Sequence, residues 1–86
     1  MQFDGAVVKE QGVIFGIYVV QGHVLNNSAE AANARRLFMR ALGAMPVVLM
    51  AQDSRGVPTY NGRRDIVEFL ANIEMSRIPW KTYTVN

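Results

Sequence analysis

One uninterrupted apolar run, VIFGIYVV at residues 13–20, places the strongest constraint on how this chain can fold. The run is rich in β-branched and aromatic residues, which favour strands. A strand with one wet face alternates apolar and polar residues, and this run does not, so it predicts a central strand buried on both faces. We expect a helix to cover one face and a partner subunit to cover the other. Gly16 marks a bulge or a close approach to the backbone.

A second strongly apolar strand is expected at residues 47–52, directly after Pro46. The Asp-Ser-Arg-Gly sequence that follows at 53–56 has Asp first and Gly fourth, a favoured type I turn. The chain then returns as a strand over residues 57–60. Pro58 has no backbone N–H to donate, so this return strand belongs at an edge of the sheet.

Two amphipathic helices complete the pattern. The first is predicted over residues 28–42, with Asn27 as its N-cap and Gly43 just past its end. The second is predicted from Gly62 or Arg63 to Ile73, with Asn61 as its cap. Each helix has an apolar stripe at helical spacing: Ala31, Ala34, Phe38, Ala41 and Leu42 in the first, and Ile66, Phe69, Leu70 and Ile73 in the second.

Strands over residues 3–8 and 80–85 bring the element order to β-β-α-β-β-α-β. Polar turns that end in Gly-Val occur at 8–13 and 52–57, and each hairpin precedes a helix. A repeated ββα unit with a closing strand predicts an α+β domain, a mostly antiparallel sheet with two helices on one face. The uncovered face is a second reason to expect a homodimer.

The composition limits the chemistry that one small domain of residues 1–86 can perform. The absence of cysteine excludes disulfides, thiol nucleophiles and thiolate metal sites, and one histidine cannot form a multi-histidine zinc centre. We therefore expect neither metal nor cofactor. A net charge of +2 is too small to hold nucleic acid unless the basic residues cluster. With Asp4 where a signal peptide is basic, and no long apolar stretch, we expect a cytoplasmic protein that makes no membrane contact.

The best candidate for a ligand site is the start of the second helix. Arg63 and Arg64 stand there with Tyr60 and Asp65, beside the free backbone N–H groups of a helix start. Two guanidinium groups and such N–H groups suit an anion or a partner's carboxylate. The alternative is a plain surface pairing of each arginine with an Asp or Glu.

Secondary candidates lie along the preceding hairpin, three of them at its turn and Thr59 at its far end. Asp53, Ser54, Arg55 and Thr59 carry groups that bind polar ligands. The alternative is a solvated turn in which Asp53 bonds its own backbone. His23 has no titratable neighbour in sequence, and we expect it in a loop with a backbone partner.

Residues 46–73 resemble the C-terminal half of a thioredoxin-like domain. In that family a proline opens a strand, a glycine-containing hairpin follows, and a helix such as Asp-Ile-Val-Glu-Phe-Leu covers the sheet. The resemblance covers about a third of the chain and implies a cysteine-less thioredoxin-like fold as the alternative architecture, without redox chemistry. The string PVVLMAQDSRGVPTYNGRRDI is also similar to a family of uncharacterised small bacterial proteins, which implies no activity.

Three classes of function compete. We favour a non-catalytic binding or protein-interaction module that acts as a homodimer. The second class is a nucleic-acid binder that uses arginines with Tyr60, Trp80 and Tyr83 as stacking surfaces, which requires all of them on one face. The third is a small enzyme that uses Asp53 or Asp65 with Tyr60 and an arginine. No nucleophile–base pair or metal-ligand spacing in the sequence supports it.

Overall fold

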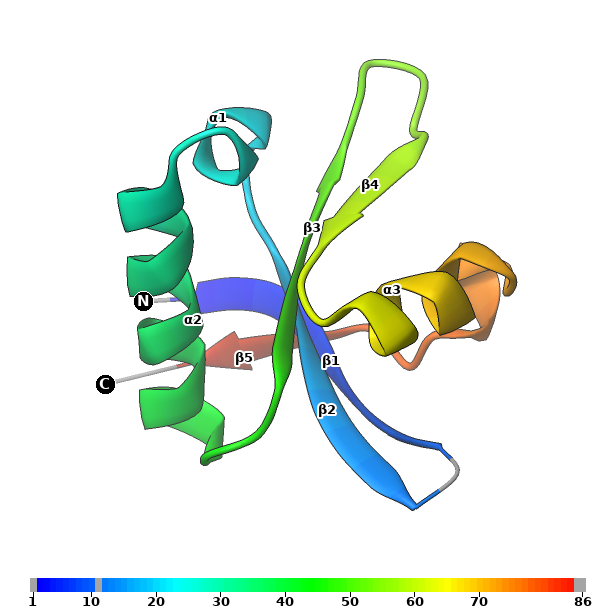
Figure 1. The fold of residues 1–86 in the computed structure, drawn as a ribbon, viewed down its shortest axis with the longest axis horizontal. Helices are drawn as coiled ribbons and strands as arrows, with labels where there is room; N and C mark the ends of the chain where they lie inside the picture. The colour runs from blue at the N-terminus through cyan, green and yellow to red at the C-terminus, as the bar shows by residue number, and fades with distance from the viewer. Residues whose placement is uncertain (1, 11, 85–86) are drawn as a thin grey trace.

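The elements of the chain follow the predicted order in a computed structural model that describes residues 2–10 and 12–84 (Figure 1). In chain order they are β1 (Gln2–Glu10), β2 (Val13–Val19), α1 (Gly22–Leu25), α2 (Ser28–Leu42), β3 (Val47–Gln52), β4 (Pro58–Asn61), α3 (Arg64–Ala71), the 3-10 helix η1 (Met75–Arg77) and β5 (Lys81–Thr84). The α+β class is confirmed, and the order departs from the prediction only by the short helices α1 and η1. The predicted last strand extends to Val85, which lies outside the described residues.

The strands form one five-stranded sheet in the order β4-β3-β2-β1-β5. Three of the four neighbouring pairs are antiparallel, so the prediction of a mostly antiparallel sheet is confirmed. The exception is β2 with β3, which run parallel. Parallel neighbours need a crossover connection, and α2 provides it. Strand β4 lies at one edge of the sheet, as Pro58 predicts.

The two long helices lie on opposite faces of the sheet, so the prediction that both cover one face is wrong (Figure 1). Val47 and Leu49 of β3 belong to the core under α2, whereas Val48 and Met50 belong to the core under α3. The cause is the connectivity. Helix α2 crosses one face to join β2 to β3, and the segment with α3 joins the two edge strands across the face that α2 leaves free.

Strand β2 is buried on both faces within a single chain. Phe15 and Ile17 pack on the α3 side, and Tyr18 packs on the α2 side. A Cβ built on Gly16 would lie 2.2 Å from the ring of Phe38, so the predicted close approach is confirmed. The apolar run therefore needs no partner subunit, and the homodimer stays a prediction without this support.

Helix α2 has the predicted bounds, and its ends are fixed as expected. The side-chain oxygen of Asn27 accepts a hydrogen bond from the backbone N–H of Glu30 at 3.0 Å. Past the last turn, Gly43 adopts a φ of 109° and donates its N–H to the carbonyl of Met39. Glycine adopts this left-handed backbone without a steric penalty, so the helix ends where the sequence places the glycine.

Helix α3 is shorter than predicted at both ends, and Asn61 does not cap it. The N-cap is Arg63, whose side chain makes no capping bond. Asn61 belongs to β4, where its backbone carbonyl and side-chain oxygen both accept from Arg35 of α2. The Nε of Arg35 also donates to the carbonyl of Val47 at 3.1 Å. One arginine thus ties α2 to the ends of two strands.

Within the described residues, no helix is long and apolar enough to cross a membrane.

Candidate functional site

The arginines at the start of α3 are already paired with carboxylates of the chain itself. Arg63 donates to both carboxylate oxygens of Asp65, at 2.7 and 2.8 Å. Arg64 donates to Glu68 one turn further on, at 3.2 Å. Hydrogen bonding from Arg63 lowers the pKa of Asp65 to about 2, because it stabilises the charged carboxylate. An external anion at this position has to displace Asp65.

Tyr60 points into the core rather than toward these arginines. Its ring packs against the apolar cluster under α3. Its hydroxyl is closed off from water and, among the described residues, has no hydrogen-bond partner. The burial raises the pKa of this hydroxyl, because ionisation in an apolar surrounding is costly. The structure therefore brings Arg63, Arg64 and Asp65 together but leaves the hydroxyl of Tyr60 apart.

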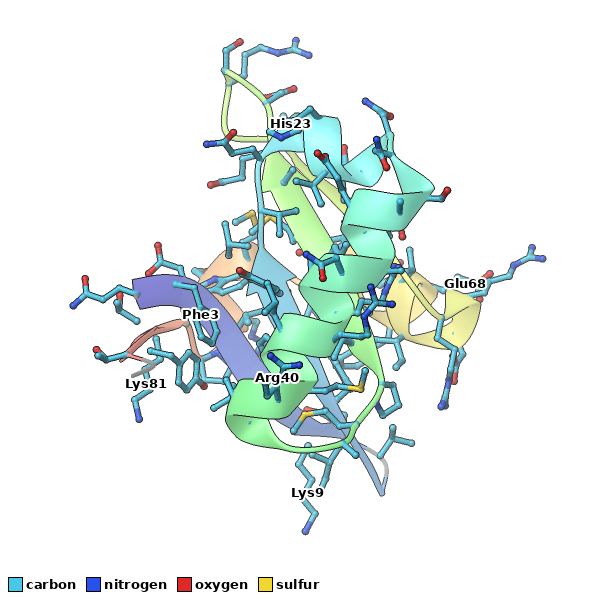
Figure 2. The ribbon with its side chains drawn as sticks, turned by 90° about the vertical axis from the view of Figure 1, so that its left-hand side faces the viewer. Phe3, Lys9, His23, Arg40, Glu68 and Lys81 are labelled. Carbon is cyan, nitrogen blue, oxygen red and sulfur yellow. The ribbon has the colours of Figure 1, made fainter. Side chains whose placement is uncertain are left out.

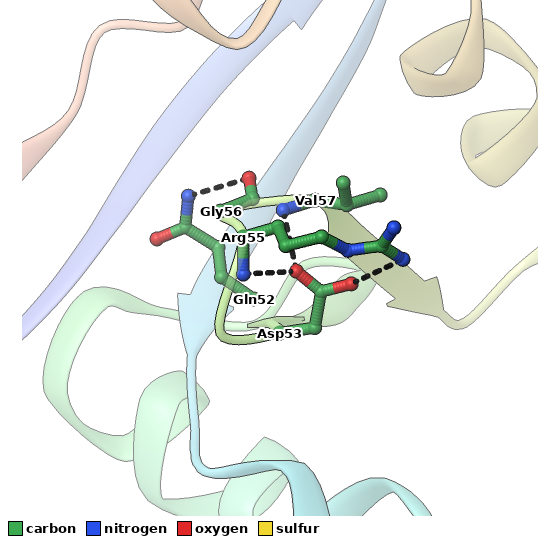
Figure 3. A network of polar contacts seen from close by, with 5 residues as sticks. All are labelled: Gln52, Asp53, Arg55, Gly56 and Val57. Carbon is green, nitrogen blue, oxygen red and sulfur yellow. Dashed lines mark hydrogen bonds and ion pairs between the residues drawn. The ribbon is translucent and has the colours of Figure 1, made fainter.

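The turn residues use their hydrogen bonds within the turn (Figure 3). One carboxylate oxygen of Asp53 accepts from the backbone N–H groups of Arg55 and Val57, at 2.8 and 3.0 Å. The other oxygen lies 3.6 Å from the Arg55 guanidinium. Ser54 is exposed. This arrangement is the solvated turn given above as the alternative to a polar ligand site.

Two of the secondary candidates share a small cleft. Asp53 and Thr59 line a cavity of about 260 Å³ between α1 and the β3–β4 hairpin, with Asn26 on its α1 side. Because the carboxylate of Asp53 is engaged in the turn, this cleft offers a ligand mainly amide and hydroxyl groups.

A larger cleft of about 570 Å³ lies on the α2 face, where β2 ends. Its walls come from the start of β1, the end of β2, helix α1 and α2 as far as Leu37. Cavities of this size hold small organic molecules in other proteins. Leu37 on the α2 wall is 38% exposed, which leaves apolar surface at the cleft uncovered.

The floor of this cleft is aromatic and rigidly supported. The rings of Phe3 and Tyr18 line it, with centroids 5.1 Å apart. Phe38 packs against both rings, with centroid distances of 5.7 and 5.8 Å, and is itself fully buried. Such tilted pairs are favourable arrangements for aromatic rings. The floor therefore exists before any ligand arrives.

The rim of the cleft is polar. His23 on α1 and Glu30 on α2 face each other, with 3.7 Å between the imidazole Nε2 and a carboxylate oxygen. The amide side chains of Gln21 and Asn33 also line it. Figure 2 views this side of the molecule, with His23 and Phe3 both beside α2. The expected loop placement of His23 is thus wrong, because a short helix forms there and turns it toward Glu30.

Sequence reasoning missed this cleft, although one signal could have located it. In sheets with parallel strands, ligands bind beyond the carboxyl ends of those strands. Strands β2 and β3 are parallel, and residues 21–27 follow the carboxyl end of β2. Had the parallel pair been predicted, the segment that contains His23 would have become the leading candidate.

No family model matches the chain, and no curated protein or solved structure matches it either. The thioredoxin-like and bacterial resemblances therefore stay predictions. In the part of the chain that the structure describes, no three His, Asp or Glu side chains are grouped so that they could hold a metal ion.

Proposed function

We propose that this protein is a small non-catalytic binding module that receives a small organic molecule in the cleft between β2, α1 and α2. The observation that carries the proposal is the combination of a supported aromatic floor and a polar rim in one cavity of about 570 Å³. Apolar walls provide affinity, and a few polar groups orient the ligand. The proposal includes a cytoplasmic location.

The cleft is a better candidate than the predicted anion site because its polar groups are less committed. At the start of α3, Arg63 makes two short hydrogen bonds to Asp65. An anionic ligand there would only replace the carboxylate of Asp65 as the partner of Arg63, so its binding would gain little free energy. At the cleft, His23 and Glu30 stand 3.7 Å apart, with side chains 65% and 50% exposed, so both remain accessible.

A nucleic-acid-binding function has less support. Stacking needs free aromatic faces beside basic residues. The indole N–H of Trp80 is bonded to the carbonyl of Met75 at 2.9 Å, and the ring is half-buried. Tyr83 stacks on Phe3, and Tyr60 packs against the core under α3. The three aromatic residues considered for stacking are thus engaged within the fold.

The proposal is tested with 2-phenylethanol, a neutral and water-soluble molecule with one aromatic ring. We expect amide NMR signals of residues around the cleft to shift together and to saturate, with a dissociation constant in the millimolar range for so few non-hydrogen atoms. Asn33→Trp places a large ring at the rim and should abolish the shifts.

The matched control is Ala29→Trp, which adds the same ring at an exposed position of α2 that does not line the cleft. This variant should bind like the wild type. Shifts that are scattered over the surface, that never saturate, or that respond equally to both tryptophans would contradict the proposal.

A further inference from the structure

We propose that the cleft selects a small organic cation, namely a protonated amine carried on an apolar or aromatic body. This inference rests on the proposed function, because it names the ligand class of the same cleft. The protein carries a formal net charge of +2 with histidine neutral. Among the residues that line the cleft, however, Glu30 is the one acidic side chain, and none is lysine or arginine. The cleft is therefore locally acidic on a basic protein.

The hydrogen-bonding groups of the cleft also match an ammonium group. An ammonium has donors and no acceptor, so it needs oxygen atoms or aromatic faces around it. Glu30 supplies a half-exposed carboxylate, and the side-chain carbonyl of Asn33 stands one turn further along the same wall. Phe3 and Tyr18 line the floor, where Phe3 is largely buried and stacked on Tyr83, so Tyr18 offers the more exposed ring. Aromatic faces attract cations through their negative quadrupole, while the same faces bury an apolar body.

Two positive charges act against this preference, and neither outweighs Glu30. The start of α2 carries about half a positive charge, spread over its unsatisfied N–H groups, and Asn27 already bonds one of them. Arg40 lies ten residues beyond Glu30 on α2, which is about 15 Å along the axis. At physiological salt the screening length is about 8 Å, so Arg40, although one turn beyond Leu37 at the far end of the cleft, acts weakly on the Glu30 end. The full negative charge of Glu30 therefore sets the sign of the electrostatic potential at its end of the cleft.

The test compares three ligands that share a phenyl ring on a two-carbon chain: 2-phenylethylamine as the cation, 2-phenylethanol as the neutral molecule and phenylacetate as the anion. Titrations use amide NMR at about pH 8, where a primary alkylamine is protonated and a carboxylic acid is ionised. We expect the amine to bind about two- to fivefold more tightly than the alcohol, as for a half-exposed ion pair, and phenylacetate to bind most weakly.

Glu30→Gln keeps the shape of the side chain and removes its charge, so it should bring the amine and the alcohol to equal affinity. Its matched control is Glu68→Gln on α3, which makes the same change in net charge away from the cleft and should keep the difference. Equal binding of amine and alcohol by the wild type, or an unchanged ratio in Glu30→Gln, overturns the cation preference while the binding function stands. Failure of all three ligands to shift the cleft signals overturns both.

Discussion

Gly16 and Phe38 interlock, and the energy of this contact can be measured directly. Gly16 lies in the middle of β2, and the ring of Phe38 on α2 fills the space above it. In Gly16→Ala the new Cβ would lie 2.2 Å from Cε1 and 2.6 Å from Cζ of that ring. No Cβ tolerates such distances, so the helix or the ring must move. Phe38 cannot move freely, because it is fully buried against Phe3 and Tyr18.

Two opposing effects set the expected size of the change. Overpacking of a well-packed core costs about 1–3 kcal/mol. Where there is room for the methyl group, replacing a strand glycine by alanine instead stabilises by about 0.5–1 kcal/mol, since alanine loses less backbone entropy. Phe38→Leu removes the Cε1 and Cζ atoms that cause the worst clash. In the Phe38→Leu background, Gly16→Ala should therefore be neutral or stabilising, which gives a coupling energy of about 1–4 kcal/mol.

The assay is a double-mutant cycle from urea unfolding curves, followed by circular dichroism and by the fluorescence of Trp80, the one tryptophan. Coincident transitions from the two probes justify a two-state treatment. Gly22→Ala is the control, because nothing lies within 4 Å of a Cβ there and the φ is ordinary. It should change stability by less than about 0.5 kcal/mol. A Gly16→Ala penalty that is equally large with Leu at position 38 would refute the steric reasoning.

Three further predictions concern single side chains. Arg63 holds the pKa of Asp65 at about 2, below its ordinary 3.8. The wild type should therefore be more stable than Asp65→Asn above pH 3.8, and this difference should be lost as the pH falls to about 2. Acid unfolding curves of the two proteins measure the difference. Tyr60→Phe removes a buried hydroxyl that has no hydrogen-bond partner among the described residues, so it should leave the melting temperature unchanged or raise it; a loss of stability above about 1 kcal/mol would mean that the hydroxyl is bonded. Phe69 is partly exposed whereas Phe38 is fully buried, so Phe69→Ala should cost less than the roughly 3–5 kcal/mol expected of Phe38→Ala, and equal losses in urea unfolding would contradict this.

The sequence predicted local structure well because the signals for it are local. Asn27 and Gly43 fix the two ends of α2 through bonds that span only three or four residues. Asp53 and Gly56 define their turn in the same way. The cap of α3 was predicted wrongly because Asn61 is bound by Arg35, which is 26 residues away in the chain. No local pattern contains such a contact.

The arrangement of the helices could not be read from the same signals. An apolar run such as that of β3 says that both faces are covered, but not by what. The parallel pairing of β2 with β3 decides that α2 crosses one face and leaves the other to α3. The cleft depends on this pairing too. Phe3, Tyr18 and Glu30 lie far apart in the sequence, and the order of the strands brings them to one cleft. Pairing between distant strands thus determines the site, and sequence spacing alone does not encode it.

The predicted homodimer can be tested at the edges of the sheet. Helices cover both faces of the sheet, so the two edges are the parts of the sheet that a second copy can join directly. The β4 edge is poorly suited, because Pro58 lacks an N–H and the carbonyl of Asn61 is already bonded to α2. The β5 edge carries four residues without a proline. An exposed strand edge pairs readily with another, and charged side chains along it prevent this.

We therefore expect a dimer to form through β5 and to be sensitive to added charge on that strand. Thr84→Lys places a second cation on the short strand that already holds Lys81, so it should turn the dimer into a monomer. Thr59→Lys makes the same substitution at an exposed position of β4 and should leave the dimer intact. Sedimentation equilibrium at micromolar concentration measures the mass of each protein. A wild-type mass of one chain refutes the dimer, and a dimer that survives Thr84→Lys places its interface elsewhere than β5.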